Sequence, residues 1–455
     1  MKINAGSHKY FILFLSLGLV PALYTEDRPL SSPEKSTRQD VWLTVFVHGI
    51  ISIKPHVTVT NFIRFLNDDV NESLYAETVD IMRDDPFFFQ NQPVQARGLK
   101  SIDLTLHKKG FAANLLANLY EQVSSLNSAN HTKNYYYTYG WTGLLSRSAR
   151  YNDAKEFLTA LEAEVAKFRA QGLNPKVRLI GYSHGGTVIL KLALVKQTEQ
   201  REPNFKINEA FLLGTPIQYD TDYLINDSLF GKIYNIFSRS DRVQKLDFFS
   251  CGQFFSAHEF QPHCGFEILP EKLTQIEIRI IRKKGENCTP ITLASAQEPL
   301  IFDGKRCSRS IRNVSPGHTE LWFFGWTPMN YRKTFPLYPL PIVSISPYII
   351  NAIQPYMQNF KSDKPVIITI DPRRNSMIVN NNNLCDKEIY KLPFISIDKL
   401  LAFKKEALDQ KPDPNLYNWE TFNEHITQAY EKAIVILNEK KCERHKNPNS
   451  ISACK

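Results

Sequence analysis

The sequence lacks several features that would assign it quickly to a class of protein. None of its seven cysteines precedes residue 251, and no two of them form a CxxC pair. We find no internal repeat and no membrane-spanning apolar run after the N-terminus. The net charge is +9, yet the lysines and arginines form no long block. These absences argue against repeat proteins, CxxC-type zinc modules and nucleic-acid-binding proteins, and leave only a mild affinity for acidic or membrane surfaces.

The bulk composition is that of a folded protein. Hydrophobic residues make up 43% of the chain and charged residues 22%, which is ordinary for a globular fold. A chain of 455 residues can bury a large core, enough for one large domain or two of ordinary size.

The N-terminus has the layout of a secretory signal peptide. Two lysines precede an uncharged apolar stretch from Phe11 to Leu23, and Val20 and Ala22 offer a small-residue cleavage site. We therefore predict a signal peptide over residues 1–22 and an exported chain, secreted or in the periplasm or cell envelope. An uncleaved segment that anchors the protein in a membrane is the alternative.

The cysteines predict disulfide bonds rather than a metal site. They are Cys251, Cys264, Cys288, Cys307, Cys385, Cys442 and Cys454. Because an exported chain meets oxidising conditions, we expect at least one disulfide, with Cys442–Cys454 the most local pair. Zinc bound by Cys251, Cys264, His258 and His263 is the competing interpretation; without a CxxC pair we predict no metal and no cofactor.

Strand-like and helix-like segments alternate over the first half of the chain. Valine-rich or aromatic runs that end in turn residues predict strands at 41–49, 134–143, 176–182, 207–213 and 232–237. Helical periodicity predicts helices at 111–126, 154–172 and 186–200. The alternation predicts an α/β fold, with a mostly parallel sheet and helices on both faces.

The second half of the chain is harder to interpret. We assign residues 40–335 to one catalytic domain, in which 242–315 form a cysteine-bearing insertion or lid with one alternating strand at 275–283. Residues 336–455 are expected to form a C-terminal extension of unknown role, with a strand at 365–371 and a helix starting at 419. Phenylalanines at 237 and between 248 and 260 predict either an acyl pocket or ordinary core.

Ser183 is the candidate nucleophile. It lies in a G-x-S-x-G pattern, between Gly181 and Gly185, after a strand and before a helix. In that context a sharp turn lifts the serine hydroxyl above the sheet, and glycines are needed because neighbouring backbone passes too close for a Cβ atom. A tight packing turn without chemistry is the alternative.

A serine hydroxyl needs a base, and the base needs an orienting carboxylate. Asp241 follows the strand at 232–237 closely, and His318 lies on a loop before an aromatic helical segment. Both alternatives to these assignments are structural: a solvated turn aspartate and a helix-capping histidine. The competing candidates are Asp222, Asp227 and Asp247 for the acid, and His258 and His263 for the base.

The tetrahedral intermediate of acyl transfer needs two backbone N–H donors. One is expected from His184, directly after the nucleophile, and the other from Ile50, in the loop that follows the strand at 41–49. His48 and Gly49 precede that donor, and the glycine keeps the turn open.

Together, these segments resemble the α/β-hydrolase superfamily, and within it the lipase and esterase branch. The resemblance rests on "VFVHG", "GYSHGG", "LLGTP", "SRSD" and "GHTELW", and covers roughly residues 40–325. It implies a Ser183–His318–Asp241 triad, an oxyanion loop at His48-Gly49-Ile50, and small-molecule esters or lipids as substrates. Alternatives with the same residues are a thioesterase, amidase or acyltransferase, or an inactive scaffold that acts as an exported binding protein.

Overall fold

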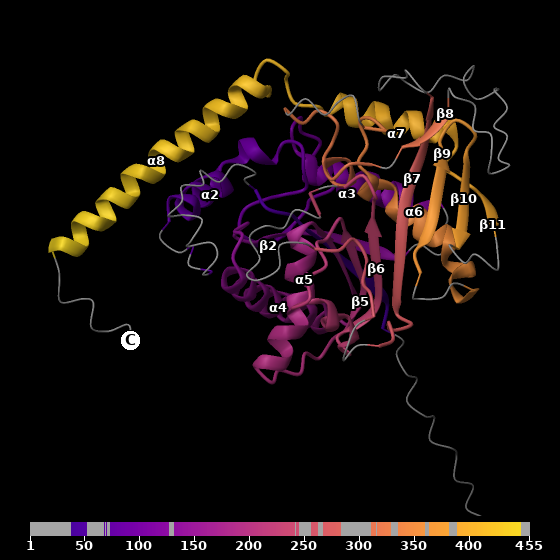
Figure 1. Cartoon of the computed structure of the whole chain (residues 1–455), viewed down its shortest axis with the longest axis horizontal. Helices are drawn as coiled ribbons and strands as arrows, with labels where there is room; N and C mark the ends of the chain where they lie inside the picture. Colours follow the sequence, from indigo (N-terminus) through magenta and orange to yellow (C-terminus); the bar gives the residue numbers. More distant parts are fainter. Residues whose placement is uncertain are drawn as a thin grey trace, which may run out of the picture. The chain divides into compact units, whose positions relative to one another are not determined.

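A sheet of eleven strands forms the centre of the fold in the computed structural model (Figure 1). The described residues are 38–51, 68, 70, 73–126, 132–241, 243–244, 256–262, 267–283, 311–314, 316–328, 335–359, 364–381 and 389–446. Residues from Gln39 onward make one unit. The predicted signal peptide and all cysteines except Cys442 lie outside the described residues, and Cys442 is an exposed free thiol.

The sheet is mostly parallel. Its strand order is β11-β10-β9-β7-β6-β5-β4-β1-β3-β2, with β8 paired to β7. Strands β3, β1, β4, β5, β6, β7 and β9 run parallel, and β2, β8, β10 and β11 pair antiparallel to their neighbours. The bounds are β1 Asp40–Val47, β2 Gly98–Ser101, β3 Lys133–Gly140, β4 Asn174–Tyr182, β5 Ile207–Leu213, β6 Phe230–Phe237, β7 Leu273–Lys283, β8 Ile311–Val314, β9 Val366–Asp371, β10 Ser376–Asn381 and β11 Ile389–Pro393.

Helices cover both faces of this sheet, as the alternating pattern predicted. The α-helices are α2 Leu74–Asp84, α3 Ala112–Ser125, α4 Arg147–Ala170, α5 His184–Thr198, α6 Ile342–Ile353, α7 Ile397–Asp409 and α8 Trp419–Lys446. Short 3-10 helices are η1 Pro86–Phe89, η2 Asp222–Asn226, η4 Thr319–Leu321 and η6 Gln354–Asn359. No α-helix in these ranges is both long and apolar enough to cross a membrane.

Successive residues of the central strands enter two different cores. In β1, Val45 and Val47 pack with α4 and α5, whereas Phe46 packs with α3 and α6 on the other face. Because both faces of such a strand are buried, nearly all of its residues are apolar, which explains the composition of residues 41–47.

The chain after residue 335 belongs to the same sheet and the same core. β9 pairs parallel with β7, and β10 and β11 continue the sheet beyond it. Ile345 and Ile349 of α6 and Ile368 of β9 share one apolar cluster with Phe46. Residues after 335, which the sequence did not assign to the sheet or to a helical layer, therefore extend the sheet and cover one of its faces.

The long helix α8 packs along α2, near the β2 edge of the sheet (Figure 1).

Candidate active site

Ser183 is the single residue between β4 and α5. Its backbone has φ 52° and ψ −130°, in the region that side chains other than glycine avoid. Such a conformation costs of order 1–3 kcal/mol and persists only where the surroundings hold it. The Ser183 amide donates to the carbonyl oxygen of Leu213 at 2.9 Å, which ties the turn to the neighbouring strand β5. The side chain lies at the carboxyl end of the parallel strands.

Three glycines let other backbone approach this turn. A Cβ on Gly181 would lie 2.7 Å from the Gly186 backbone, and one on Gly185 would lie 2.3 Å from the His48 carbonyl oxygen. A Cβ on Gly49 would lie 3.0 Å from the Ser183 Cβ atom, so the loop after β1 passes directly beside the serine. The backbone around the turn therefore leaves no room for a side chain at Gly181 or Gly185.

His318 and Asp241 form a hydrogen-bonded pair. The His318 Nδ1–H donates to Asp241 Oδ2 at 2.6 Å, although the two residues lie 77 positions apart. Asp241 follows β6 and is fully buried, whereas the His318 side chain, directly before η4, is 11% exposed. A buried carboxylate that accepts from Nδ1–H fixes the imidazole ring and leaves Nε2 as the acceptor.

Two further residues hold Asp241 in place. The amide of Gln244 donates to Asp241 Oδ1 at 3.0 Å, so each carboxylate oxygen has one donor. His258 Nε2–H donates to the Asp241 carbonyl oxygen at 2.7 Å and is buried. The sequence left His258 as a competing base or a zinc ligand; in the structure its ring lies against the backbone of Asp241, the candidate acid.

The histidine–aspartate pair lies next to the serine turn. A Cβ on Gly214, the residue after Leu213, would lie 3.0 Å from Asp241 Oδ2 and 3.2 Å from His318 Nδ1. The Tyr182 hydroxyl donates to the His318 carbonyl oxygen at 3.2 Å, and the two rings are 4.7 Å apart. The ends of β4 and β5 thus contact the loops that carry the pair.

The two expected oxyanion donors are the residue after Ser183 and a residue of the loop beside it. His184 is the first residue of α5, at the end of the helix where the dipole favours negative charge. Ile50 follows Gly49 in the loop beside the serine and is half-buried. The His184 ring accepts a hydrogen bond at Nδ1 from the Arg150 guanidinium, at 3.3 Å.

His48 is a structural residue of this loop. Its Nδ1–H donates to the Gly49 carbonyl oxygen at 2.6 Å, and its ring stacks on Trp141 with centroids 5.5 Å apart. Burial, with a smaller contribution from the Arg83 charge, lowers the pKa of His48 well below its ordinary value. The ring therefore resists protonation as the pH falls through the ordinary range of histidine.

Basic groups gather under the start of α5. Burial lowers the pKa of Lys191 to about 8, and the nearby Arg150 charge adds to this. Arg147 pairs with Asp220 at 3.2 Å on the same side of the sheet. Arg150 contacts the start of α5 through the His184 ring, whereas Asp220 and Asp68 partly offset the charges of Arg147 and Lys191.

The competing candidates lie elsewhere or outside the described residues. Asp227 pairs with Lys196 at 3.1 Å, and Asp222 begins η2. Asp247, His263, Cys251, Cys264 and most of the phenylalanine cluster are not among the described residues. Phe237 and Phe260 are buried core residues, as the plainer interpretation of that cluster expected.

Comparison with known proteins adds no assignment: no family model matches the sequence, and no curated protein matches it.

Proposed function

We propose that this protein is a serine hydrolase of the α/β-hydrolase type that cleaves carboxylic esters, including lipid esters, through an acyl-enzyme. The observation that carries the proposal is the His318–Asp241 hydrogen bond of 2.6 Å beside a serine held at φ 52°. A strained serine between a strand and a helix, followed in the chain by an acid and then a histidine, is the arrangement used by that superfamily.

Each residue has a defined task in this mechanism. The Ser183 hydroxyl attacks the ester carbonyl carbon while His318 Nε2 takes its proton, and Asp241 stabilises the resulting imidazolium. The oxyanion accepts from the backbone N–H groups of His184 and Ile50. His318 then gives its proton to the alcohol that leaves, and water hydrolyses the acyl-enzyme by the same steps in reverse. A thioester or an activated amide would follow the same route.

Labelling with a fluorophosphonate probe tests the proposal, because only an activated serine reacts with it. We expect one equivalent of label on the folded protein, none after heat denaturation, and none in Ser183→Ala. That variant should lose at least about 10³-fold in hydrolysis of p-nitrophenyl butyrate, with an unchanged circular dichroism spectrum. Ser240→Ala is the matched control, because Ser240 lies in the turn just before Asp241. This variant should keep both the fluorophosphonate labelling and the hydrolysis of p-nitrophenyl butyrate.

An inactive scaffold would give the opposite result. If folded wild-type protein takes up no label and Ser183→Ala hydrolyses the ester as fast as wild type does, the hydrolase proposal is wrong.

A further inference from the structure

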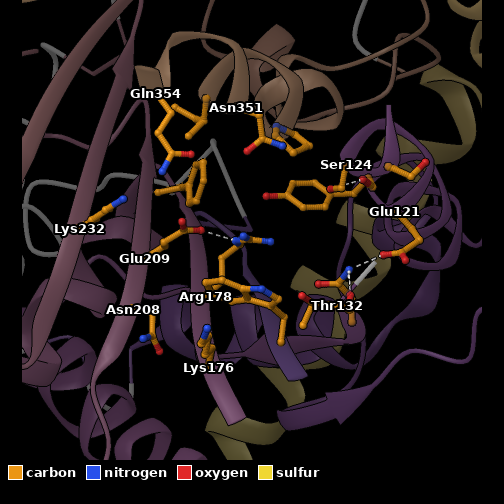
Figure 2. Close-up of a pocket in the computed structure, with 17 residues that line it drawn as sticks. Glu121, Ser124, Thr132, Lys176, Arg178, Asn208, Glu209, Lys232, Asn351 and Gln354 are labelled. Carbon is orange, nitrogen blue, oxygen red and sulfur yellow. Dashed lines mark hydrogen bonds and ion pairs between the residues drawn. The ribbon is translucent and has the colours of Figure 1, made fainter. Parts of the chain in front are cut away.

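A cavity of about 440 Å³ lies on the α3 and α6 side of the sheet (Figure 2). Its floor is made by the amino-terminal halves of β1, β4, β5 and β6, whereas Ser183 follows the carboxyl end of β4. Helices α3 and α6, with the start of η6, form its walls. This volume is in the range of sites that hold one small molecule.

An ion pair forms the floor. Arg178 Nε–H donates to Glu209 Oε2 at 2.7 Å, and the side chains are only 14% and 17% exposed. The Arg178 guanidinium also lies over the Trp42 ring, 4.2 Å from its centroid. These contacts fix the guanidinium in one orientation. A guanidinium has five N–H donors and a carboxylate has about four acceptor positions, so the pair retains donors and acceptors beyond its mutual bond and the contact of Arg178 with the Tyr120 hydroxyl.

Amides and a second fixed carboxylate surround this floor. Asn351 of α6 and Gln354 of η6 lie across the cavity from Arg178 (Figure 2). Glu121 Oε2 accepts from the Tyr136 hydroxyl at 2.5 Å and from Asn134 Nδ2 at 2.8 Å, which holds it at the wall. Hydroxyl groups line the same wall, from Ser124, Ser125 and Thr132. Ser124 and Ser125 donate to the backbone carbonyl oxygens of Tyr120 and Gln122, at 2.7 Å each, so the wall offers acceptors here and donors at the amides.

The charges of the lining nearly cancel. Lys232 and Arg178 are balanced by Glu121 and Glu209, and the remaining cation, Lys176, pairs with Asp40 at 2.5 Å. A strongly anionic or cationic ligand would find no excess of opposite charge here. The lining suits a ligand that carries no net charge and that donates and accepts hydrogen bonds at several atoms.

We propose that this cavity binds a neutral, multiply hydroxylated small molecule, a sugar or polyol. Each hydroxyl group both donates and accepts, which matches a wall of amides, hydroxyls and a fixed guanidinium–carboxylate pair. The site is independent of the ester-hydrolase proposal, because none of its lining residues belongs to the serine turn or to the loops of Asp241 and His318.

Isothermal titration calorimetry with the full chain tests this inference. The probes are maltose and myo-inositol up to roughly 20 mM, with glucose 6-phosphate and glucosamine as charged comparators. We expect a neutral probe to bind more tightly than either comparator. Asn351→Leu and Gln354→Leu should each weaken binding about five- to tenfold, the loss expected for one or two hydrogen bonds.

Gln428→Leu is the matched control, an exposed amide on helix α8 away from the cavity. It should leave binding unchanged, and all three variants should keep the wild-type melting temperature and fluorophosphonate labelling. Failure of both neutral probes to bind, preferential binding of a charged comparator, or equal weakening by Gln428→Leu would each overturn the inference. Absence of labelling alone would bear only on the hydrolase proposal.

Discussion

At the residue scale, close backbone approaches decide the geometry around Ser183. Gly185 lies in the first turn of α5, where helix propensity by itself favours alanine over glycine by about 1 kcal/mol. The carbonyl oxygens of Val47 and His48 nevertheless pass so close that no Cβ fits at Gly185. Because those atoms belong to the end of the central strand, they cannot move cheaply, and the steric effect outweighs propensity.

Gly185→Ala is therefore expected to destabilise the protein by more than about 3 kcal/mol and to abolish fluorophosphonate labelling. Gly172→Ala is the comparison, because φ there is +78° but an added Cβ would meet no other atom within 4 Å. It should cost only about 1 kcal/mol and leave labelling intact. Urea unfolding of the two variants gives both values; similar losses would contradict the steric argument.

The buried His48 ring makes stability depend on pH. The unfolded chain takes up a proton at this histidine below pH 6.5, while folded His48 stays neutral because its pKa is well below that value. The unfolded state then binds more protons, so the free energy of unfolding falls as pH falls through 6.5, by at most about 1.4 kcal/mol per pH unit.

The measurement is the free energy of unfolding in urea between about pH 7.5 and pH 5.5, for wild type and for His48→Leu. The variant should be less stable at the upper end of that range, because it loses the bond to Gly49, and its stability should fall less steeply with acid. Parallel curves for the two proteins would rule out His48 as the source.

At the scale of elements, α8 depends on a narrow line of contacts. Its first half is fixed by His425 Nδ1–H, which donates to Asp85 Oδ2 at 2.6 Å, and by the stacking of that ring on Phe87 with centroids 3.8 Å apart. Further along, Ala433 is fully buried, and Lys440 pairs with Glu77 of α2. A small residue on the packed side lets the two helices approach closely.

Ala433→Asp should therefore release the second half of α8 from α2, because it places an unpaired charge in a closed contact. Val435→Asp makes the same change at a position that is 55% exposed and should have almost no effect. Amide hydrogen exchange of residues 430–446 measures the difference. We expect faster exchange in the first variant only; equal protection in both would mean that this contact does not hold the helix.

At the scale of the whole molecule, the late strands close the sheet. β9 pairs with β7 through Ile276–Ile280, and α6 covers the apolar face of those strands. A chain that ends at residue 335 would leave this face exposed to solvent. Burying apolar surface contributes about 25 cal/mol per Å², so the loss of several isoleucine contacts would exceed the stability of an ordinary domain.

Deletion of residues 336–455 should consequently prevent cooperative folding. The truncated chain is expected to be insoluble, or to bind a hydrophobic dye and melt without a transition, whereas the full chain should unfold in one step seen alike by fluorescence and circular dichroism. A soluble fragment ending at residue 335 that unfolds in a sharp transition would show that β9, β10 and β11 are not needed for folding.

The sequence by itself determined the local elements that depend on neighbouring residues. The valine-rich run of β1, the periodicity of α3 and α4, and the strand–glycine–helix context of Ser183 are all visible within windows of about ten to twenty residues. The mostly parallel α/β class followed from their alternation, and the structure confirms it. Of the candidate site, the positions of Ser183, Asp241 and His318 were identified from turns that follow strands and from a loop before an aromatic segment.

Only the tertiary structure decided which distant segments meet. The contact of His318 with Asp241 spans 77 residues, and the bond from His258 supports a backbone carbonyl that no side-chain pattern marks. Insertion of β9 beside β7 is likewise invisible locally, because a proline-broken stretch precedes α6 and strand pairing depends on partners far along the chain. Periodicity reports which face of an element is buried; it carries no information on what lies against that face.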